Sequence, residues 1–119
     1  MGFKGILKQI VDESCGLGGV IMGYDGIAIE EYLRDAAGLD VQTMTIEYAS
    51  VLKEIKRTVG VLKTGELEEV SIITEKCCVI VRGISEDFFA ALVLASDGNF
   101  GKARFLLKRA APAFRESLQ

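Results

Sequence analysis

The sequence contains no histidine, one proline and three cysteines among its 119 residues. Without histidine, a Ser-His-Asp or Cys-His nucleophile cannot form, and the most frequent general base and transition-metal ligand is missing. Two acidic clusters remain, at Glu30-Glu31 and at Glu66, Glu68 and Glu69. Their expected strand positions favour solvated edges over an acid–base or metal site. We therefore expect no catalytic residue, no metal and no cofactor.

The three cysteines, Cys15, Cys77 and Cys78, are an odd number and lack metal-ligand spacing. Neighbouring residues on a strand point to opposite faces, so Cys77 and Cys78 are poorly placed for a disulfide. Free thiols are typical of a reducing cytosol. The N-terminus lacks the apolar stretch of a secretory signal, and no segment reaches the roughly 18 to 20 apolar residues of a membrane span. We expect a cytoplasmic protein without a membrane span.

The charge balance gives little support to a nucleic-acid partner. The chain has 17 acidic and 14 basic residues, a net charge of −3. Domains that bind nucleic acid non-specifically neutralise phosphates and are usually strongly basic. Half of the residues are apolar, and the length suits a single core. We expect one ordered domain, residues 1–119, that does not bind nucleic acid.

The first third of the chain predicts a helix followed by a hairpin. Apolar residues at helical spacing indicate an amphipathic helix over residues 3–14. Glycines then end it, and residues 20–22 and 27–33 are typical of two strands. Asp25-Gly26 between them supplies the left-handed conformations of a tight turn.

A polar loop, residues 34–41, precedes a long helix predicted over residues 43–63, with Asp40 or Thr43 as its N-cap. A helical projection divides this helix into an apolar face and a mixed face of small, apolar and basic residues. The mixed face allows another helix to approach closely, which favours a protein interface there. The predicted buried face comprises Met44, Tyr48, Val51, Leu52, Ile55, Val59 and Leu62, and the mixed face comprises Ile46, Ala49, Ser50, Lys53, Lys56, Arg57 and Gly60.

Three strands and a helix complete the prediction. The strands, at residues 67–74, 77–84 and 88–95, are joined by turns so short that they must run antiparallel. The last two are apolar on both alternating sets, so helices must cover both faces of the sheet. The last helix, residues 100–118, has a basic side that can face solvent, nucleic acid, a membrane surface or an acidic protein. The order α-β-β-α-β-β-β-α places the chain in the α+β class.

Two segments carry a family resemblance: Gly19-Val-Ile-Met-Gly-Tyr-Asp-Gly-Ile-Ala-Ile29 and Asn99-Phe-Gly-Lys-Ala-Arg-Phe-Leu-Leu-Lys-Arg-Ala-Ala111. Together with the element order, they resemble the Roadblock/dynein light chain family, and among bacterial members the mutual gliding protein B type. The resemblance implies a five-stranded antiparallel sheet with the middle helix on one face and the terminal helices on the other. It also implies homodimers that pair through the third strand and the middle helix into a ten-stranded sheet.

Site residues follow from that resemblance. Proteins of the mutual gliding protein B type bind a small Ras-like GTPase and stimulate its hydrolysis by reshaping the GTPase's own switch region. Here the paired middle helices would present Lys53, Lys56 and Arg57 to the GTPase. The dimer interface would comprise Ile46, Ala49, Ser50, Gly60, Leu67, Glu69, Val70, Ser71, Ile72 and Ile73.

Two other functions remain open at this point. The first is a structural adaptor, a scaffold for a motor or signalling complex that dimerises and tethers other proteins. The second is a small-molecule sensor with a cavity under the sheet lined by residues such as Tyr24, Tyr32 and Phe89.

Overall fold

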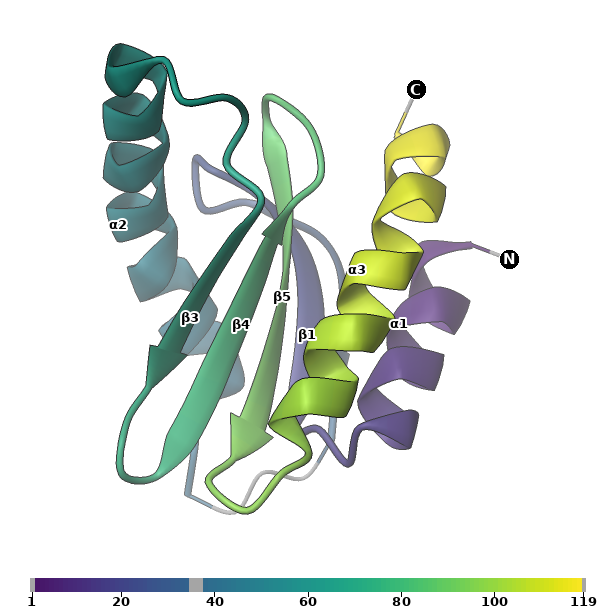
Figure 1. Cartoon of the computed structure of the whole chain (residues 1–119). Helices are drawn as coiled ribbons and strands as arrows, with labels where there is room; N and C mark the ends of the chain where they lie inside the picture. Colours follow the sequence, from purple (N-terminus) through teal and green to yellow (C-terminus); the bar gives the residue numbers. More distant parts are fainter. Residues whose placement is uncertain (1, 35–37, 119) are drawn as a thin grey trace.

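The chain alternates helices and strands in the predicted order (Figure 1). The computed structural model describes residues 2–34 and 38–118, so the predicted loop 34–41 lies partly outside the described residues. The elements are α1 (Phe3–Glu13), β1 (Gly18–Gly23), β2 (Ala28–Leu33), α2 (Val41–Leu62), β3 (Glu69–Ile73), β4 (Cys77–Gly83), β5 (Phe88–Ala95) and α3 (Phe100–Ser117).

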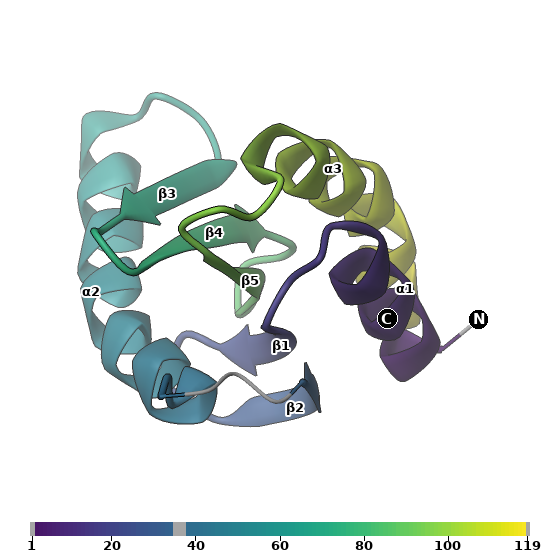
Figure 2. The same ribbon diagram turned by 90° about the horizontal axis from the view of Figure 1, so that it is seen from below.

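The five strands form one antiparallel sheet in the order β2-β1-β5-β4-β3, so β2 and β3 are its edges. Helix α2 lies against one face, and α1 and α3 lie side by side on the other (Figure 2). The α+β class and the helix arrangement are therefore as predicted. Both faces of the central strands are covered because both sets of their side chains are apolar.

The core has two layers, one on each side of the sheet. Under α1 and α3 lie Ile21, Ile80 and Leu92, and under α2 lie Val79 and Val93. Cys77 belongs to the α2 layer and Cys78 to the other. The prediction that the adjacent cysteines point to opposite faces is confirmed, and all three cysteines are free thiols.

Strand β1 begins at Gly18, two residues earlier than predicted. A Cβ atom at Gly19 would lie 3.0 Å from Leu92 Cδ2 and 3.1 Å from Val11 Cγ2. Gly18 and Gly19 lie inside the strand, where close neighbouring side chains leave little room for a Cβ, and α1 already ends at Glu13, so the prediction that this glycine pair breaks the helix is wrong. Strand β2 begins one residue later than predicted, because Ile27 belongs to the turn, where its N–H donates to Asp25 Oδ1 at 3.0 Å.

Capping side chains set the starts of the two longer helices. Asp40 caps α2, since Oδ1 accepts from the Thr43 N–H at 3.0 Å and Oδ2 from the Thr43 hydroxyl at 2.7 Å. Asn99 caps α3 by accepting from the Lys102 N–H at 3.1 Å. Helix α2 therefore starts two residues before its predicted first residue.

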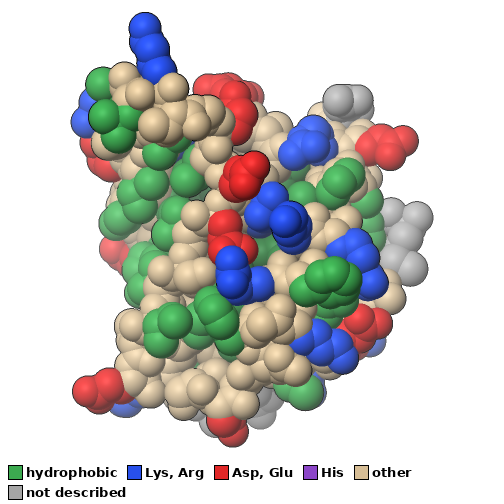
Figure 3. Space-filling model, in the orientation of Figure 1, with side chains coloured by type: hydrophobic (Ala, Val, Ile, Leu, Met, Phe, Trp, Pro, Cys, Tyr) green, Lys and Arg blue, Asp and Glu red, His purple; other side chains and the backbone are tan. Residues whose placement is uncertain are grey.

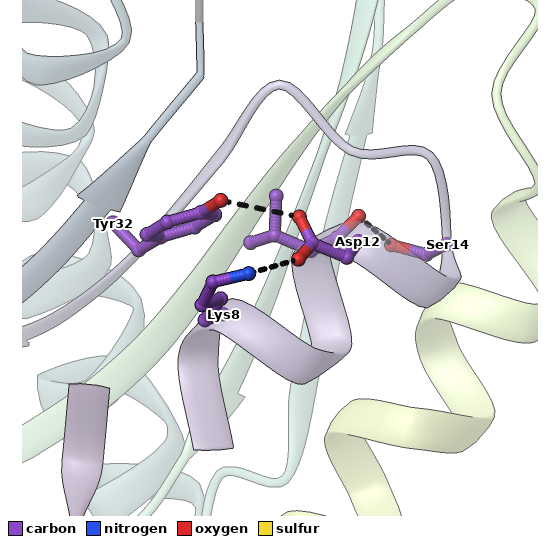
Figure 4. A network of polar contacts seen from close by, with 5 residues as sticks. Lys8, Asp12, Ser14 and Tyr32 are labelled. Carbon is purple, nitrogen blue, oxygen red and sulfur yellow. Dashed lines mark hydrogen bonds and ion pairs between the residues drawn. The ribbon is translucent and has the colours of Figure 1, made fainter. Parts of the chain in front are cut away.

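A polar network connects α1 to the edge strand β2 (Figure 4). Asp12 accepts from Lys8 Nζ at 2.8 Å and from the Tyr32 hydroxyl at 3.2 Å. Lys8 Nζ also lies 5.6 Å from the centre of the Tyr32 ring. At the end of the helix, the buried Ser14 hydroxyl donates to the Ile10 carbonyl at 2.7 Å. These contacts fix α1 over β2 and leave the opposite edge strand, β3, free of α1.

Candidate functional site: the open edge of β3 and the adjoining flank of α2

Strand β3 is an edge strand, paired only with β4 among the described residues. Its sequence, Glu-Val-Ser-Ile-Ile, is apolar at three of five positions. Exposed edges normally carry lysine, proline or a bulge to prevent pairing with another chain. β3 carries neither a proline nor a lysine, and its register with β4 is regular. The edge is therefore a template for strand addition.

The hydrogen bonds to β4 show which backbone groups of β3 face outward. The Gly83 N–H donates to the Glu68 carbonyl at 3.0 Å, and the Thr74 N–H to the Cys77 carbonyl at 2.9 Å. In an antiparallel ladder, hydrogen-bonded and non-hydrogen-bonded residue pairs alternate. The N–H and C=O groups of Glu69, Ser71 and Ile73 therefore point away from β4, toward the open edge.

The side chains of β3 alternate between the two faces of the sheet. Val70 and Ile72 pack against the core layer beneath α2. Glu69, Ser71 and Ile73 lie on the face of α1 and α3, opposite Arg82, Ile80 and Cys78. Ile73 is 70% exposed. Both faces of the open edge thus carry apolar side chains at its rim.

One flank of α2 contacts the far edge and the loops of the sheet. Gln42 Nε2 donates to Glu31 Oε1 of β2 at 3.3 Å. Lys56 Nζ lies 3.3 Å from Glu86 Oε1, in the β4–β5 turn, and 4.6 Å from the ring centre of Tyr24, in the β1–β2 turn. Since β2 is one edge of the sheet, the opposite flank of α2 faces the other edge, β3.

That opposite flank is apolar. Val51 is 50% exposed and Leu62 is 64% exposed, while Tyr48 and Ile55 are half-buried between them and the core. Figure 3 shows apolar side chains along α2 where it adjoins β3. Tyr48 and Ile55 pack against the same core layer as Val70 and Ile72, so the apolar flank of α2 and the open edge of β3 adjoin that layer on the same face of the sheet.

The structure corrects the predicted faces of α2. Ala49 is only 1% exposed, so the prediction that it lies on the outer surface is wrong. Val51 and Leu62, predicted to be buried, are exposed. The residues against the sheet include the small side chains of Thr45 and Ala49, which allow close approach of helix and strand. The buried stripe is therefore rotated from the predicted one.

The remaining predicted interface residues divide between two places. Ile46, Ser50 and Gly60 are exposed on α2, but on the side away from the apolar flank. Leu67 precedes β3 instead of lying inside it, because the observed strand starts at Glu69 and not at the predicted residue 67. The structure brings together on one edge strand Glu69, Val70, Ser71, Ile72 and Ile73.

The three cations predicted to meet a partner differ in their availability. Lys53 is exposed, and Arg57 is exposed with its Nε 3.1 Å from Glu54 Oε2. The Lys56 side chain is only 20% exposed because it lies over Tyr24 and pairs with Glu86. Lys53 and Lys56 also line a hollow of about 530 Å³ with Tyr24 and Glu86. Of these three cations, fewer are free to contact a partner than the sequence indicates.

The residues expected to line a sensor cavity do not lie together. Tyr24 and Phe89 are neighbours in the core layer beneath α2, with ring centres 5.2 Å apart. Tyr32 packs on the opposite face of the sheet, beside α1. The prediction of one cavity shared by these three residues is therefore wrong.

Two further tests concern metals and membranes. The part of the chain that the structure describes contains no group of three or more Cys, Asp or Glu side chains placed to hold a metal ion. Within residues 2–34 and 38–118, no helix combines the length and the apolar character required to cross a membrane.

Known structures share this architecture. The crystal structure of MglC from Myxococcus xanthus is 37% identical, with a TM-score of 0.71 and an alignment covering 98% of each chain. A structure of MglB in a tetrameric arrangement is 18% identical, with a TM-score of 0.82 over 95% of this chain and 85% of that one. A Roadblock/LC7 domain from Streptomyces avermitilis is 12% identical, with a TM-score of 0.79 over 99% and 98% of the two chains. No protein-family model and no curated protein matches the sequence.

The element order, the antiparallel sheet and the placement of α2 opposite α1 and α3 define a Roadblock-type domain. The identity to MglC over nearly the whole of both chains goes further than a shared fold. The chain belongs to the Roadblock family that includes MglB and MglC.

Proposed function

We propose that the chain is a non-enzymatic, homodimeric regulator that binds a small Ras-like GTPase and stimulates its GTP hydrolysis. Family membership supports the regulatory role, and the open β3 edge beside an apolar flank of α2 supports the dimer. The single observation that carries the proposal is that exposed Val51 and Leu62 lie on the flank of α2 that faces β3, whose backbone groups at Ser71 and its neighbours point outward.

The backbone orientation of β3 suggests how two copies pair. With Ser71 at the two-fold axis, all five residues of β3 find a partner, which is the maximum overlap for this strand. Val70 would then lie opposite Ile72 of the second copy, extending the apolar layer beneath α2. The apolar flanks of the two α2 helices would meet across the same axis, burying Val51 and Leu62.

Pairing through β3 would place the two α2 helices side by side on one face of a ten-stranded sheet. We propose that the GTPase docks on this face and contacts Lys53 and Arg57, the exposed cations of α2. Lys56 would have a positioning role, because it is held over Tyr24 and paired with Glu86. The chain would contribute no catalytic side chain, and hydrolysis would be stimulated through the GTPase's own switch region.

The test uses the full chain and a small Ras-like GTPase from the same organism. We expect a complex on gel filtration and faster GTP hydrolysis, both reduced by Lys53→Glu and Arg57→Glu. Lys76→Glu, an equal charge change in the exposed turn before β4, is the matched control and should leave both unchanged. Absence of a complex with either nucleotide, together with an unchanged hydrolysis rate, would overturn the proposal.

A structural adaptor is the second candidate. The observation that favours it is the pairing of Arg57 with Glu54 and of Lys56 with Glu86, which leaves few free cations for a GTPase. An adaptor would use the same dimer but bind its partners equally in the GDP and GTP states. Equal binding in both states with no change in hydrolysis would therefore favour the adaptor.

A further inference from the structure

The outward face of α3 carries an exposed aromatic side chain among cations. Phe105 is 59% exposed, on the side of α3 opposite the buried Ala103, Leu106, Leu107 and Phe114. We propose that this face is a docking site for an acidic segment of another protein that places an apolar side chain against Phe105. The inference does not depend on how β3 and α2 are used.

The cations of α3 are not equivalent. Arg104 is paired with Glu69 of β3, and Arg115 Nε donates to the Ile84 carbonyl at 2.8 Å. These two arginines hold the helix to the sheet. Lys102, Lys108 and Arg109 have no ion-pair partner among the described residues and remain available to a ligand.

The three free cations surround Phe105. Residues three and four positions apart are neighbours on a helix surface, which places Lys102, Lys108 and Arg109 around the ring. The Arg109 guanidinium carbon lies 5.4 Å from the ring centre, within cation–π range. At the fourth neighbouring position, Gly101 has open space where a Cβ would be. A single exposed aromatic side chain is common on protein surfaces and does not by itself indicate a binding site. Phe105 differs because three cations without ion-pair partners in the described part of the chain surround it and the neighbouring Gly101 leaves space beside it.

Charge is strongly segregated between α3 and the rest of the chain. Residues 100–118 carry five cations and one carboxylate, Glu116, so they have a net charge of +4. The whole chain has a net charge of −3, which leaves −3 − 4 = −7 for all other residues. An acidic segment would therefore be repelled by most of the surface and attracted to α3.

The same segregation disfavours two other ligands. A nucleic acid or an anionic membrane extends beyond one helix face and would bring its negative charge against the acidic remainder of the chain. Phe105 is the one aromatic on the outward face of α3. Proteins that bind single-stranded nucleic acids usually offer several aromatic side chains on which successive bases stack. A short acidic segment matches the size of the basic face without these costs.

The site lies on the face of the sheet opposite α2, and Figure 3 shows apolar and basic side chains together over α3. Pairing through β3 and α2, as proposed above, would not use the outward side of α3. A dimer would thus present two such sites, one for each copy, at the same time as its α2 face.

The experiment measures binding of labelled peptides to the full chain by fluorescence anisotropy. The probe is a peptide of repeated Glu-Glu-Leu units, compared with one of repeated Gln-Gln-Leu units. We expect the acidic peptide to bind at least about tenfold more tightly, with an affinity that falls as salt rises. Phe105→Ala and Lys108→Glu should each weaken binding by about tenfold. The matched control, Lys4→Glu on α1, should leave it unchanged.

Circular dichroism melts of each variant establish that it is folded. The proposal is overturned if both peptides bind equally, if Lys4→Glu weakens binding as much as Lys108→Glu, or if Phe105→Ala has no effect. It is also overturned if phosphatidylserine vesicles or single-stranded DNA bind in a Phe105-dependent manner and the acidic peptide does not.

Discussion

The Arg104 Nε–H of α3 donates to Glu69 Oε2 in β3 at 2.9 Å, and Arg104 Nη2 lies 2.6 Å from the same carboxylate oxygen in an ion pair. This contact joins the last helix to the open edge strand, 35 residues earlier in the chain. It holds the Glu69 side chain on the α3 face while the backbone of Glu69 faces the open edge. β3 is therefore fixed by α3 as well as by its ladder with β4.

Glu69→Gln should lower the thermal midpoint by a small amount, because the pair is half-exposed and solvent weakens it. The difference from the wild type should shrink in high salt, which screens the ion pair. Thermal melts at low and high salt measure this, with Glu68→Gln, an exposed neighbour, as the control. An equal loss at both salt concentrations would show that the charge interaction is not the cause.

Val51→Lys should weaken the dimer by at least about tenfold in Kd, because it places a charge in the apolar flank that faces β3. Ile46→Lys is the matched control, since Ile46 is 47% exposed and Val51 is 50% exposed on the same helix. Dilution series by analytical ultracentrifugation distinguish the two. A dimer weakened by Ile46→Lys and not by Val51→Lys would place the interface on the face that the sequence predicts.

The stabilising contribution of Asp12 should be lost in acid. The hydrogen bond from Lys8, with further help from Tyr32, holds the pKa of Asp12 below its usual 3.8. A carboxyl whose pKa is lower in the folded chain adds stability above its unfolded pKa and loses it as the pH falls through the folded pKa. Asp12→Asn should therefore remove part of the stability difference between neutral pH and pH below 3.8. Identical pH profiles of the two proteins would contradict this.

Tyr24 should ionise later than an ordinary tyrosine. Burial, followed by the nearby carboxylates of Glu86 and Glu66, raises the pKa of Tyr24 from 10.0 to about 12. Its contribution to stability is complete below pH 10 and is lost as the pH rises from 10 to about 12, because only the unfolded chain releases the proton there. A phenolate absorbance titration should show a late step that Tyr24→Phe removes. Its persistence in Tyr24→Phe would assign the step to another tyrosine.

The order of elements could be predicted because the turns and helix starts between them have local causes, even where the boundaries shift by one or two residues. Asp25-Gly26 forms the turn, and Asp40 and Asn99 cap the helices. Short turns require antiparallel neighbours, and strands that are apolar on both sides require two helical layers. Each of these signals depends on residues close together in the sequence, so it can be recognised from the sequence alone.

The faces of α2 could not be predicted in the same way. A helical projection ranks positions by hydrophobicity, but the positions closest to the sheet hold Thr45 and Ala49, which are small. The Thr45 hydroxyl donates to the Gln42 carbonyl at 3.0 Å, so its burial leaves no unpaired group. The large apolar residues Val51 and Leu62 then lie on a flank that the single chain does not cover. A helical projection therefore cannot separate the residues that pack against the sheet from the apolar residues of the uncovered flank, and it assigns both to one buried face.

The central claim is that two copies join through the open edge of β3. Ser71→Pro tests it, because the Ser71 N–H faces outward and its loss costs no hydrogen bond within the chain. Glu31→Pro is the control on the other edge: the hydrogen bond from the Arg34 N–H to the Leu17 carbonyl sets the ladder of β2, so the Glu31 N–H points away from β1 and donates to the neighbouring Glu30 Oε1, at 3.2 Å. Circular dichroism spectra that match the wild type would establish that both variants are folded.

The deciding measurement is the mass of each protein by sedimentation equilibrium. We predict twice the chain mass of 12.9 kDa for the wild type and for Glu31→Pro, and 12.9 kDa for folded Ser71→Pro. A wild type that sediments at 12.9 kDa, or a Ser71→Pro variant that dimerises as well as the wild type, would contradict the account.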